Sequence, residues 1–550
     1  MNKYILLPSL ILGFITVSCV DDKGSYDYTP INEVSFENIE STYNAIQGFT
    51  ELEIDPTLKG DIYGNDLDNY EYKWHLCRDA FGSNEGHKND RFLSDEKTLK
   101  WLVDEPVGDY TVYFTVTDKL TGISKHTYTN VSVKSSFGRG FMLLGTNGED
   151  DLIKMDMLAM PASGDTAIVE NAFTNNGSMH KPRMIYDSGS YFSYELDVVW
   201  LFGEDGDWRL ASKESADNNE FDVLESFGDR ADNEYDIYNE RCVDLYPKRA
   251  PGGSNIFRNT SIAMTEKCCY GPVMSLYAYN RYTQPVNRMA NSSASPLFSF
   301  YPKTFYNGSL TSMTWSGTPF VIYDTDNDKF VKINVTGLNG THCVDLTDYS
   351  YVDWRWDCRS EDRKLVYGET TSTPGKGYNY FVMKSTIDDS KYWIYSLQIA
   401  SAYAQTKEIF PQKVNGVAPA VDLSLAKDFD KATLYSFIGC RRAVFYAVGS
   451  VLHQYDFERG YHMQMDMGAE ITMIKPEFYS KNRHNCLMVA TWDASEKKGE
   501  FMNLKIGDNP NKLEMEIRND VVDVRDNPLT EYLERWSTRL KIVDAEWHTR

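Results

Sequence analysis

The sequence predicts an all-β protein in which a small amino-terminal β-sandwich is followed by a β-propeller of about seven blades. Three observations lead to this fold class. Short segments of alternating apolar and polar residues recur along the chain and are broken by Gly, Asp and Asn turns. Aromatic residues make up 14% of the 550 residues, and such side chains favour strands. A unit of apolar strand, polar turn and second strand recurs from about residue 136 onward.

The first 18 residues have the pattern of an export signal. Lys3 gives a positive start, residues 5–17 form an apolar run, and a small residue precedes Cys19. The run is too short to remain as a membrane-spanning helix. The pattern resembles a bacterial lipoprotein signal, which implies removal of residues 1–18 and lipidation of Cys19, although Thr16 stands where the common motif has Leu. A plain secretory signal with an unrelated cysteine is the alternative.

Residues 19–31 are polar and rich in turn formers, and we interpret them as a tether; packing into the first domain is the alternative. Asp21 and Asp22 come almost directly after Cys19. An acidic stretch at this place resembles the signal by which Bacteroidetes lipoproteins reach the outer face of the outer membrane. The resemblance implies a lipid-anchored protein on the cell exterior, and a solvated acidic tether is the alternative.

Residues 32–135 are predicted to form the β-sandwich. Tyr72 and Trp74 belong to one short alternating strand, and a turn at residues 106–110 leads into another at 111–117. A further turn precedes a returning strand at 124–133. Strands about ten residues apart with Gly and Asp between them are typical of sandwiches.

The same segment carries a family resemblance. A tryptophan strand followed by Gly-Asp-Tyr-Thr-Val-Tyr-Phe-Thr-Val-Thr-Asp resembles a PKD-type, immunoglobulin-like domain. The opening from Cys19 to Tyr28 resembles the start of the PKD-like family lipoproteins of Bacteroidetes. Such proteins look like accessory surface components of loci for nutrient import. The resemblance, which covers residues 19 to about 135, therefore implies two partners, a TonB-dependent outer-membrane transporter and its lid lipoprotein.

Residues 136–550 are predicted to form the propeller. Radial repetition of small antiparallel sheets explains a recurring hairpin, because each sheet buries its faces against its neighbours. A stack of two or three further sandwiches is the competing architecture. A single short helix is predicted over residues 527–542, where Leu529, Tyr532, Leu533 and Trp536 have helical spacing. The visible hairpins span residues 141–156, 198–210, 320–335, 380–397, 443–455 and 487–506.

Composition excludes some functions. The net charge of -24 argues against nucleic acid and against anionic lipid headgroups, so contact with the membrane is expected through the lipid anchor only. The nine cysteines include no C-x-x-C pair, which argues against a zinc ribbon or redox motif. Most of them are expected to be small buried side chains, and the sequence does not give a disulfide pairing.

Motifs for catalysis or cofactors are scarce. The sequence has no H-E-x-x-H, G-x-S-x-G or Walker motif, and no two histidines are spaced as ligands on a helix face. Asp324, Asp326 and Asp328 alternate as at the start of a calcium loop, but Lys329 and Val335 replace the Gly and Glu that a full EF-hand loop needs. A polar turn is the favoured interpretation and a partial calcium site the alternative. We expect no cofactor and no resident metal.

Aromatic clusters are the better candidates for binding. Tyr279 and Tyr282 lie in a loop-like stretch between two prolines, and Tyr301 and Tyr306 flank Pro302. Aromatic side chains on irregular segments can stack on sugar rings or clamp a peptide. Sealing of a blade edge or of an interface with a partner protein is the alternative for these tyrosines.

Together these patterns predict a surface lipoprotein that captures an oligosaccharide or a peptide as an auxiliary subunit of a TonB-dependent importer. Binding is expected rather than catalysis. Two alternatives remain, namely a surface hydrolase or lyase with its active site in the propeller, and a purely structural assembly subunit. With 80 acidic residues, the sequence cannot single out a catalytic carboxylate pair.

Overall fold

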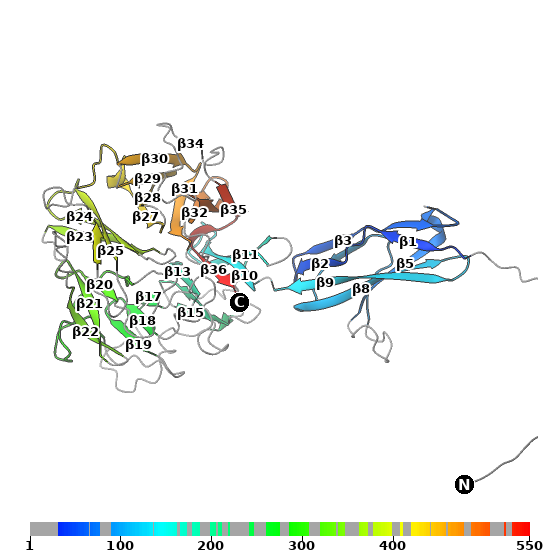
Figure 1. The fold of residues 1–550 in the computed structure, drawn as a ribbon, viewed down its shortest axis with the longest axis horizontal. Coiled ribbons are helices and arrows are strands. Elements are labelled where there is room, and N and C mark those ends of the chain that lie inside the picture. Colours follow the sequence, from blue (N-terminus) through cyan, green and yellow to red (C-terminus); the bar gives the residue numbers. More distant parts are fainter. Residues whose placement is uncertain are drawn as a thin grey trace, which may run out of the picture. The chain divides into compact units, whose positions relative to one another are not determined.

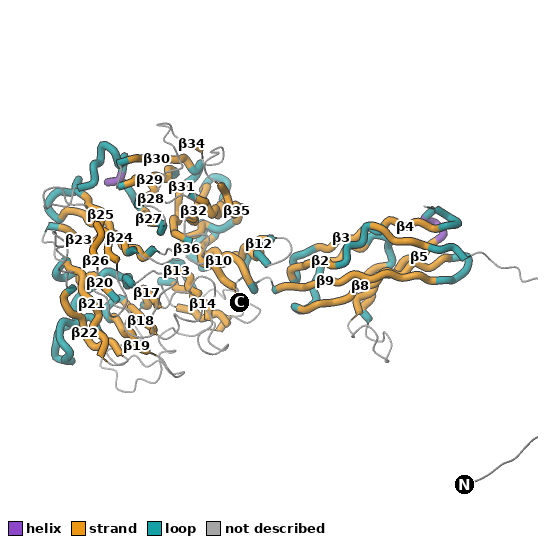
Figure 2. The backbone as a smooth tube through the Cα atoms, viewed as in Figure 1, coloured by secondary structure: helices purple, strands orange, loops and turns teal. Residues whose placement is uncertain are grey.

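Strands make up almost all of the regular structure (Figure 2). Within the residues that the structure describes, the helical segments are two 3₁₀ turns, Leu67–Asn69 (η1) and Phe429–Lys431 (η7). The computed structural model describes residues 31–64, 66–77, 90–135, 137–161, 166–172, 179–187, 198–204, 207–211, 218–219, 241–246, 260–274, 285–306, 320–336, 339–346, 362–371, 378–398, 407–410, 420–439, 442–457, 460–477, 486–506, 522–523 and 531–549.

The amino-terminal strands form the predicted sandwich (Figure 1). A five-stranded sheet has the order β2-β9-β8-β5-β6, and two shorter pairs are β1-β4 and β3-β7. Trp74 is fully buried and stacks on Phe114 with ring centroids 4.3 Å apart, while Phe36 contacts Phe114 edge-on. The strands are β1 (Val34–Glu37), β2 (Thr42–Ile46), β3 (Glu51–Ile54), β4 (Thr57–Gly60), β5 (Tyr70–Cys77), β6 (Arg91–Ser94), β7 (Leu99–Leu102), β8 (Gly108–Asp118) and β9 (Ser124–Lys134).

The propeller is formed by the strands that follow β9 in the chain. Its described strands form six sheets. One of them, β17-β18-β19-β22-β21-β20, has six strands, and we count its two halves as blades 3 and 4, which gives the seven blades that the sequence predicted. The pairings are antiparallel except that between β30 and β34. Blade 1 consists of β10 (Arg139–Thr146), β11 (Lys154–Ala159), β12 (Ala167–Val169) and β36 (Lys541–Thr549). Blade 2 consists of β13 (Met184–Asp187), β14 (Val198–Phe202), β15 (Asp207–Ala211) and β16 (Asn218–Asn219). Blade 3 consists of β17 (Cys242–Tyr246), β18 (Thr260–Thr265) and β19 (Cys269–Met274), and blade 4 of β20 (Val321–Asp324), β21 (Lys329–Thr336) and β22 (Asn339–Asp345).

The remaining blades follow the same plan. Blade 4 gains an innermost segment, because Phe300 and Phe305 form bridges to Asp324 and Val321. Blade 5 consists of β23 (Arg363–Thr370), β24 (Asn379–Ser385), β25 (Tyr392–Gln398) and β26 (Lys407–Phe410). Blade 6 consists of β27 (Leu434–Phe437), β28 (Ala443–Val448), β29 (Val451–Asp456), β30 (Tyr461–Asp466) and β34 (Val522–Asp523). Blade 7 consists of β31 (Glu470–Pro476), β32 (Cys486–Asp493), β33 (Lys498–Lys505) and β35 (Glu531–Thr538).

The carboxy-terminal strand closes the ring. β36 pairs antiparallel with β10, so the last strand of the chain completes the blade that the first propeller strand begins. In Figure 1 the red β36 lies beside the cyan β10. This pairing excludes a stack of separate sandwiches, because sandwiches in series would not join the two ends of the segment. It also provides each blade with a neighbour on both sides, which protects the sheet edges.

Local sequence explains the hairpins inside the blades. All six predicted hairpins are confirmed as the central strands of blades 1, 2, 4, 5, 6 and 7. Several of their turns begin with an aspartate whose side chain accepts N–H groups two and three residues later. Asp493 Oδ1, for example, accepts from the N–H groups of Ser495 and Glu496 at 2.8 and 3.1 Å. Turn chemistry and strand alternation therefore agree along most of the chain.

The predicted helix over residues 527–542 is wrong. The described part of this segment is β35 and the start of β36. β35 pairs with β33 and places Trp536 opposite Phe501, while β36 pairs with β10. The helical spacing of apolar residues is a weak local preference, and the completion of two blades outweighs it.

Candidate functional site

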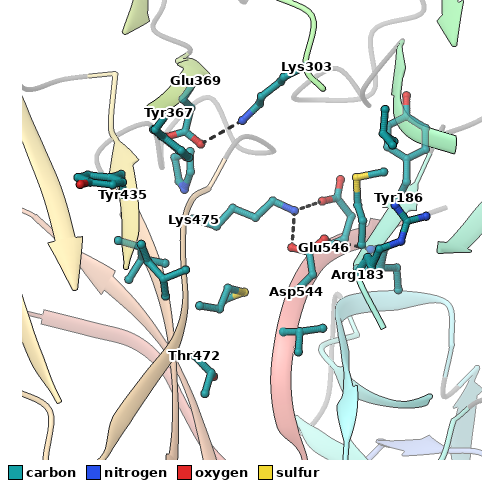
Figure 3. Close-up of a pocket in the computed structure, with 18 of the residues that line it drawn as sticks. Arg183, Tyr186, Lys303, Tyr367, Glu369, Tyr435, Thr472, Lys475, Asp544 and Glu546 are labelled. Atoms are coloured by element: carbon teal, nitrogen blue, oxygen red, sulfur yellow. Dashed lines mark hydrogen bonds and ion pairs between the residues drawn. The ribbon is translucent and has the colours of Figure 1, made fainter. Parts of the chain in front are cut away.

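The centre of the propeller contains a cavity of about 540 Å³ (Figure 3). Innermost segments of all seven blades contribute to its wall, and both charged and aromatic side chains face it. Its volume lies within the range typical of small-molecule sites. The lining residues are Arg183, Met184, Ile185, Tyr186, Phe202, Val243, Lys303, Tyr306, Val366, Tyr367, Glu369, Thr370, Ala432, Thr433, Leu434, Tyr435, Thr472, Met473, Ile474, Lys475, Pro476, Val543, Asp544 and Glu546.

Carboxylates connect the innermost strands of neighbouring blades. An innermost strand has a hydrogen-bonded neighbour on one edge only, so the N–H groups of its other edge need partners. Asp544 Oδ2 of β36 accepts from the N–H of Ile185 at 3.0 Å, which joins blades 1 and 2. Asp244 Oδ2 of β17 accepts from the N–H of Thr304 at 3.0 Å, which joins blades 3 and 4.

The same device recurs between blades 5 and 6. Glu369 Oε2 of β23 accepts from the N–H of Phe437 at 2.7 Å and from Ser436 Oγ at 3.1 Å, both on β27. Glu369 is only 5% exposed. A buried carboxylate that accepts two hydrogen bonds stabilises the contact between its blade and the next.

Lys475 forms a compact charge cluster with Asp544 and Glu546. Its Nζ lies 2.9 Å from Asp544 Oδ1, 2.8 Å from Glu546 Oε2 and 3.0 Å from the carbonyl oxygen of Ala545. Three acceptors match the three donor hydrogens of an ammonium group. Burial by itself lowers the pKa of Lys475, but the charges of both carboxylates outweigh it and raise the pKa above the ordinary value. The cluster joins blade 7 to blade 1.

Lys303 and Glu369 form a second, longer ion pair in the cavity wall, drawn above Lys475 in Figure 3. Lys303 Nζ lies 3.9 Å from Glu369 Oε1, which is beyond hydrogen-bond distance. The same ammonium stands 5.4 Å from the ring centroid of Tyr367. Burial, followed by the charge of Glu369, raises the pKa of the Tyr367 hydroxyl well above its usual range. The phenol thus stays neutral beside the ion pair.

Arg183 contacts backbone carbonyls. Its Nε donates to Gly203 O at 2.8 Å and its Nη2 donates to Cys242 O at 2.9 Å, which connects blades 2 and 3. Among the described lining residues, three are cationic and three are anionic. The cavity therefore offers many polar contacts with little net charge, although the chain as a whole carries -24.

The structure places the sequence-predicted tyrosines at different depths. Tyr306 borders the cavity but is only 7% exposed, and Asn379 Nδ2 donates to its carbonyl oxygen at 3.0 Å. Tyr301 is half-buried and stacks on Phe305 with centroids 6.3 Å apart; burial raises the pKa of its hydroxyl to about 12. Tyr279, Tyr282 and Cys19 lie outside the described residues.

Sequence reasoning missed the charged residues of the cavity. Lys303 stands two positions after Tyr301, and Glu369, Lys475 and Asp544 lie in the strands β23, β31 and β36, which also carry apolar residues. Ionisable side chains in apolar strands are rarely buried without a partner. That pattern was a signal in the sequence, but it gave no indication that these strands converge on one axis.

The acidic loop at Asp324 is a polar turn. Asp324 is fully buried, and its Oδ1 accepts from the N–H groups of Asp326 and Asn327 at 3.0 and 3.1 Å. Its Oδ2 accepts from Asn327 Nδ2 at 2.8 Å. Asp326 and Asp328 bind other groups, the N–H of Ser299 and the hydroxyl of Tyr323. The three carboxylates do not converge, and no group of three or more metal-ligating side chains occurs among the described residues.

Two further expectations can be compared with the structure. The six described cysteines are buried, as expected of small apolar side chains; they are Cys77, Cys242, Cys268, Cys269, Cys343 and Cys486. Over the described ranges, no helix is long and apolar enough to cross a membrane.

Comparisons with known proteins identify the amino-terminal region. Residues 19–177 match the PKD-like family, so the match extends from before the sandwich through β10, β11 and β12. No curated protein matches the chain. A quinonprotein alcohol dehydrogenase-like protein of Bacteroides thetaiotaomicron is structurally similar, with 11% identity, a TM-score of 0.31, and coverage of 86% of this chain and 93% of that chain.

A second structure with a similar fold is the dihydro-heme d1 dehydrogenase NirN. It is 10% identical with a TM-score of 0.31, and the alignment covers 67% of this chain and 71% of that chain. At TM-scores of 0.31, neither likeness supports a statement about this chain. The chain is an all-β protein with an amino-terminal PKD-like sandwich and a carboxy-terminal propeller.

Proposed function

We propose that this protein captures a nutrient ligand, an oligosaccharide or a peptide, in the central cavity of its propeller. The observation that carries the proposal is the cavity of about 540 Å³, whose wall combines tyrosines with three cationic and three anionic side chains. A concave site with a few convergent polar groups is the usual form of a small-molecule site. Such a wall can bind a polar, neutral ligand without a large electrostatic penalty.

Capture is favoured over catalysis by the state of the carboxylates. Asp544 accepts hydrogen bonds from Lys475, from the N–H of Ile185 and from the N–H of Ala545, so both of its oxygens hold the fold together. Glu369 likewise accepts from two groups of β27. A hydrolase of the glycosidase type needs one carboxylic acid and one carboxylate placed for the substrate. Here the described carboxylates of the cavity serve blade contacts.

We further propose that the protein is a lipoprotein anchored through Cys19 on the outer face of the outer membrane, where it assists a TonB-dependent transporter and its lid lipoprotein. The support is the signal-like sequence before Cys19, the acidic residues after it, and the match of residues 19–177 to the PKD-like family. Replacement of Cys19 by Ala is expected to release the protein from the membrane fraction. Retention of the variant in that fraction would contradict the anchor.

The capture proposal is tested by filling the cavity. Val366 lines it and keeps 36% of its surface exposed, so Val366→Trp is expected to occupy the space at little cost to folding. Isothermal titration of the full chain with neutral oligosaccharides and with short peptides should show binding that this variant abolishes. Ile387→Trp is the matched control, because Ile387 is 83% exposed in a turn and does not line the cavity. Equal binding by both variants would exclude the cavity as the site.

A further inference from the structure

One end of the amino-terminal sandwich exposes five aliphatic side chains, a group that we call the apolar end. They lie where the described chain begins, in the loop between β4 and β5, and in the turn between β8 and β9. Figure 2 shows η1, which belongs to the β4–β5 loop, at the end of the sandwich where the described chain begins. Single exposed aliphatic residues are ordinary, but a group of them at one place marks a contact site. The five, each between 40% and 78% exposed, are Ile31, Ile62, Leu67, Leu120 and Ile123.

Hydrogen bonds hold the three segments of the apolar end together. Asn32 Oδ1 accepts from the N–H of Ile62 at 2.9 Å, which joins the start of the described chain to the β4–β5 loop. The N–H of Lys119 donates to Asn69 O at 3.0 Å, and its Nζ donates to Asp68 O at 2.9 Å. These two bonds join the β4–β5 loop to the β8–β9 turn. The exposed aliphatic side chains therefore belong to one connected surface.

The turn between β8 and β9 presents Leu120 at its tip. Asp118 Oδ1 accepts from the N–H groups of Leu120 and Thr121 at 2.8 and 2.9 Å, and the N–H of Gly122 donates to Asp118 O at 2.8 Å. Gly122 has a φ of 71°, which glycine adopts without strain. The turn therefore does not depend on the Leu120 side chain. An exposed leucine at a position where turns usually carry polar residues points to a contact outside the chain.

We propose that the apolar end inserts into the surface of a zwitterionic lipid bilayer; the proposal rests on the lipid anchor proposed at Cys19. Residues 20–30 separate Cys19 from Ile31, and even a fully extended chain of that length spans only about 40 Å. The anchor therefore keeps the apolar end near the membrane. Burial of aliphatic side chains at the boundary of the acyl region adds a second contact to the lipid chain, and two contacts hold a protein more firmly than one.

The charges around the apolar end select the kind of lipid. Carboxylates predominate among the exposed charged residues of the three segments, which are Glu33, Asp61, Asp66, Asp68 and Lys119. Anionic headgroups repel such carboxylates, whereas the ammonium groups of phosphatidylcholine or phosphatidylethanolamine can face them. The net charge of -24 therefore argues against anionic lipids but not against an apolar contact with zwitterionic ones.

The test places a tryptophan at the tip of the apolar end. The full chain, purified with its anchor, is bound to phosphatidylcholine vesicles whose acyl chains carry bromine, which quenches tryptophan on contact. We expect Leu120→Trp to lose a larger fraction of its emission than the native protein, whose eleven tryptophans give the baseline. Phe92→Trp is the matched control and should behave as the native protein does. Phe92 is 53% exposed and lies opposite His75, about 17 Å along β5 from Tyr70 at the start of that strand.

Removal of the anchor measures the strength of the apolar contact. In the Cys19→Ala chain, Leu120→Ser with Ile123→Ser should weaken partition into excess phosphatidylcholine vesicles about tenfold or more. Phe92→Ser, which removes a larger side chain, should leave the partition unchanged. Vesicles with equimolar phosphatidylglycerol should bind the Cys19→Ala chain more weakly than pure phosphatidylcholine does. The contact is weaker than the anchor, so Cys19→Ala still leaves the membrane fraction on washing. Thermal unfolding shows whether each variant is folded.

Each failure has its own signature. An anchored chain in which Leu120→Trp is quenched no more than the native protein would overturn the apolar contact and leave the anchor standing. Equal partition with and without the serine substitutions, undetectable partition included, would also overturn the contact. Stronger binding to phosphatidylglycerol would overturn the choice of lipid. A native chain without lipid on Cys19 whose Leu120→Trp variant is still quenched would overturn the anchor alone. Self-association of the Cys19→Ala chain that the serine substitutions abolish would assign the surface to a second copy and overturn the lipid contact.

Discussion

Two charge clusters face the same cavity, each formed by a lysine and acidic side chains, and they differ in geometry. Lys475 Nζ lies 2.9 Å from Asp544 Oδ1 and 2.8 Å from Glu546 Oε2, which joins the last blade to the first. Lys303 and Glu369 are 3.9 Å apart. Both lysines are partly exposed, at 24% for Lys303 and 23% for Lys475, yet the cited carboxylate oxygens lie at different distances from the two ammonium groups.

The first prediction removes the ammonium from the compact cluster. Lys475→Met leaves two buried carboxylates without their counter-ion, and breaking a buried ion pair in this way costs about 3–5 kcal/mol. We expect a large fall in the denaturation midpoint of the propeller, measured by tryptophan fluorescence in urea. A change no larger than that of the exposed control Lys431→Met would show that the cluster does not hold blades 7 and 1 together.

The second prediction concerns the carboxylate of the longer ion pair. Glu369→Ala leaves the N–H of Phe437 and the hydroxyl of Ser436 without their acceptor, and an unsatisfied buried polar group costs about 1–3 kcal/mol. Glu369→Gln keeps an acceptor oxygen and should recover most of the lost stability. If Gln and Ala destabilise equally in thermal unfolding, the charge of Glu369 rather than its hydrogen bonds joins blades 5 and 6.

The third prediction concerns the pH dependence of stability that a histidine pair in blade 6 causes, apart from the two cavity clusters. His453 Nδ1 and His462 Nε2 are 3.0 Å apart, and burial lowers the pKa of each to about 4. The unfolded state takes up these protons near the ordinary value of 6.5, whereas the folded state does so only near 4. The stability that depends on these two neutral histidines is therefore fully present above pH 6.5, and it is lost as the pH drops from 6.5 toward 4.

Thermal unfolding as a function of pH checks this prediction. The double variant His453→Gln and His462→Gln should lose the decrease between pH 6.5 and 4. Hydrogen bonds lower the pKa of Asp493, so the decrease due to that group occurs below its ordinary value of 3.8. An unchanged profile in the double variant would assign the decrease to other groups, including the cavity clusters.

The smallest effect is expected for Lys303. The Lys303 side chain is 24% exposed and its Nζ lies 3.9 Å from Glu369 Oε1, so loss of this ion pair through Lys303→Met should change the stability by less than about 1 kcal/mol. The melting temperature of the variant should thus stay close to that of the native protein. A loss of stability as large as that of Lys475→Met would contradict the distinction between the two clusters.

Local sequence predicted the hairpins well because their structure depends on neighbouring residues. Alternation placed Phe141, Val198 and Leu487 in strands, and aspartates such as Asp493 marked the turns. Blade 3, which contains β17, β18 and β19, was not among the six hairpins visible in the sequence. The predicted number of about seven blades nevertheless required one more blade than those hairpins supplied. The error at residues 527–542 arose because the partners of β36 lie at the start of the propeller, some of them near residue 139, and no local pattern indicates such a pairing.

The candidate site was harder to predict than the fold. Of the predicted tyrosines, Tyr306 borders the cavity and Tyr301 packs beside its wall. The charged residues come from innermost strands of different blades, and hundreds of residues separate Lys303 from Asp544 in the sequence. Their convergence follows from closure of the ring.

The sequence by itself determined the strand-rich composition, the hairpin rhythm, the tryptophan strand of the sandwich and the signal-like start, because these depend on residue type and short spacings. Tertiary structure alone decided which carboxylates lie beside each lysine of the cavity wall and at what distance. Closure of the propeller by β36 brings Asp544 and Glu546 to Lys475, and the distances that result set the role of each charge.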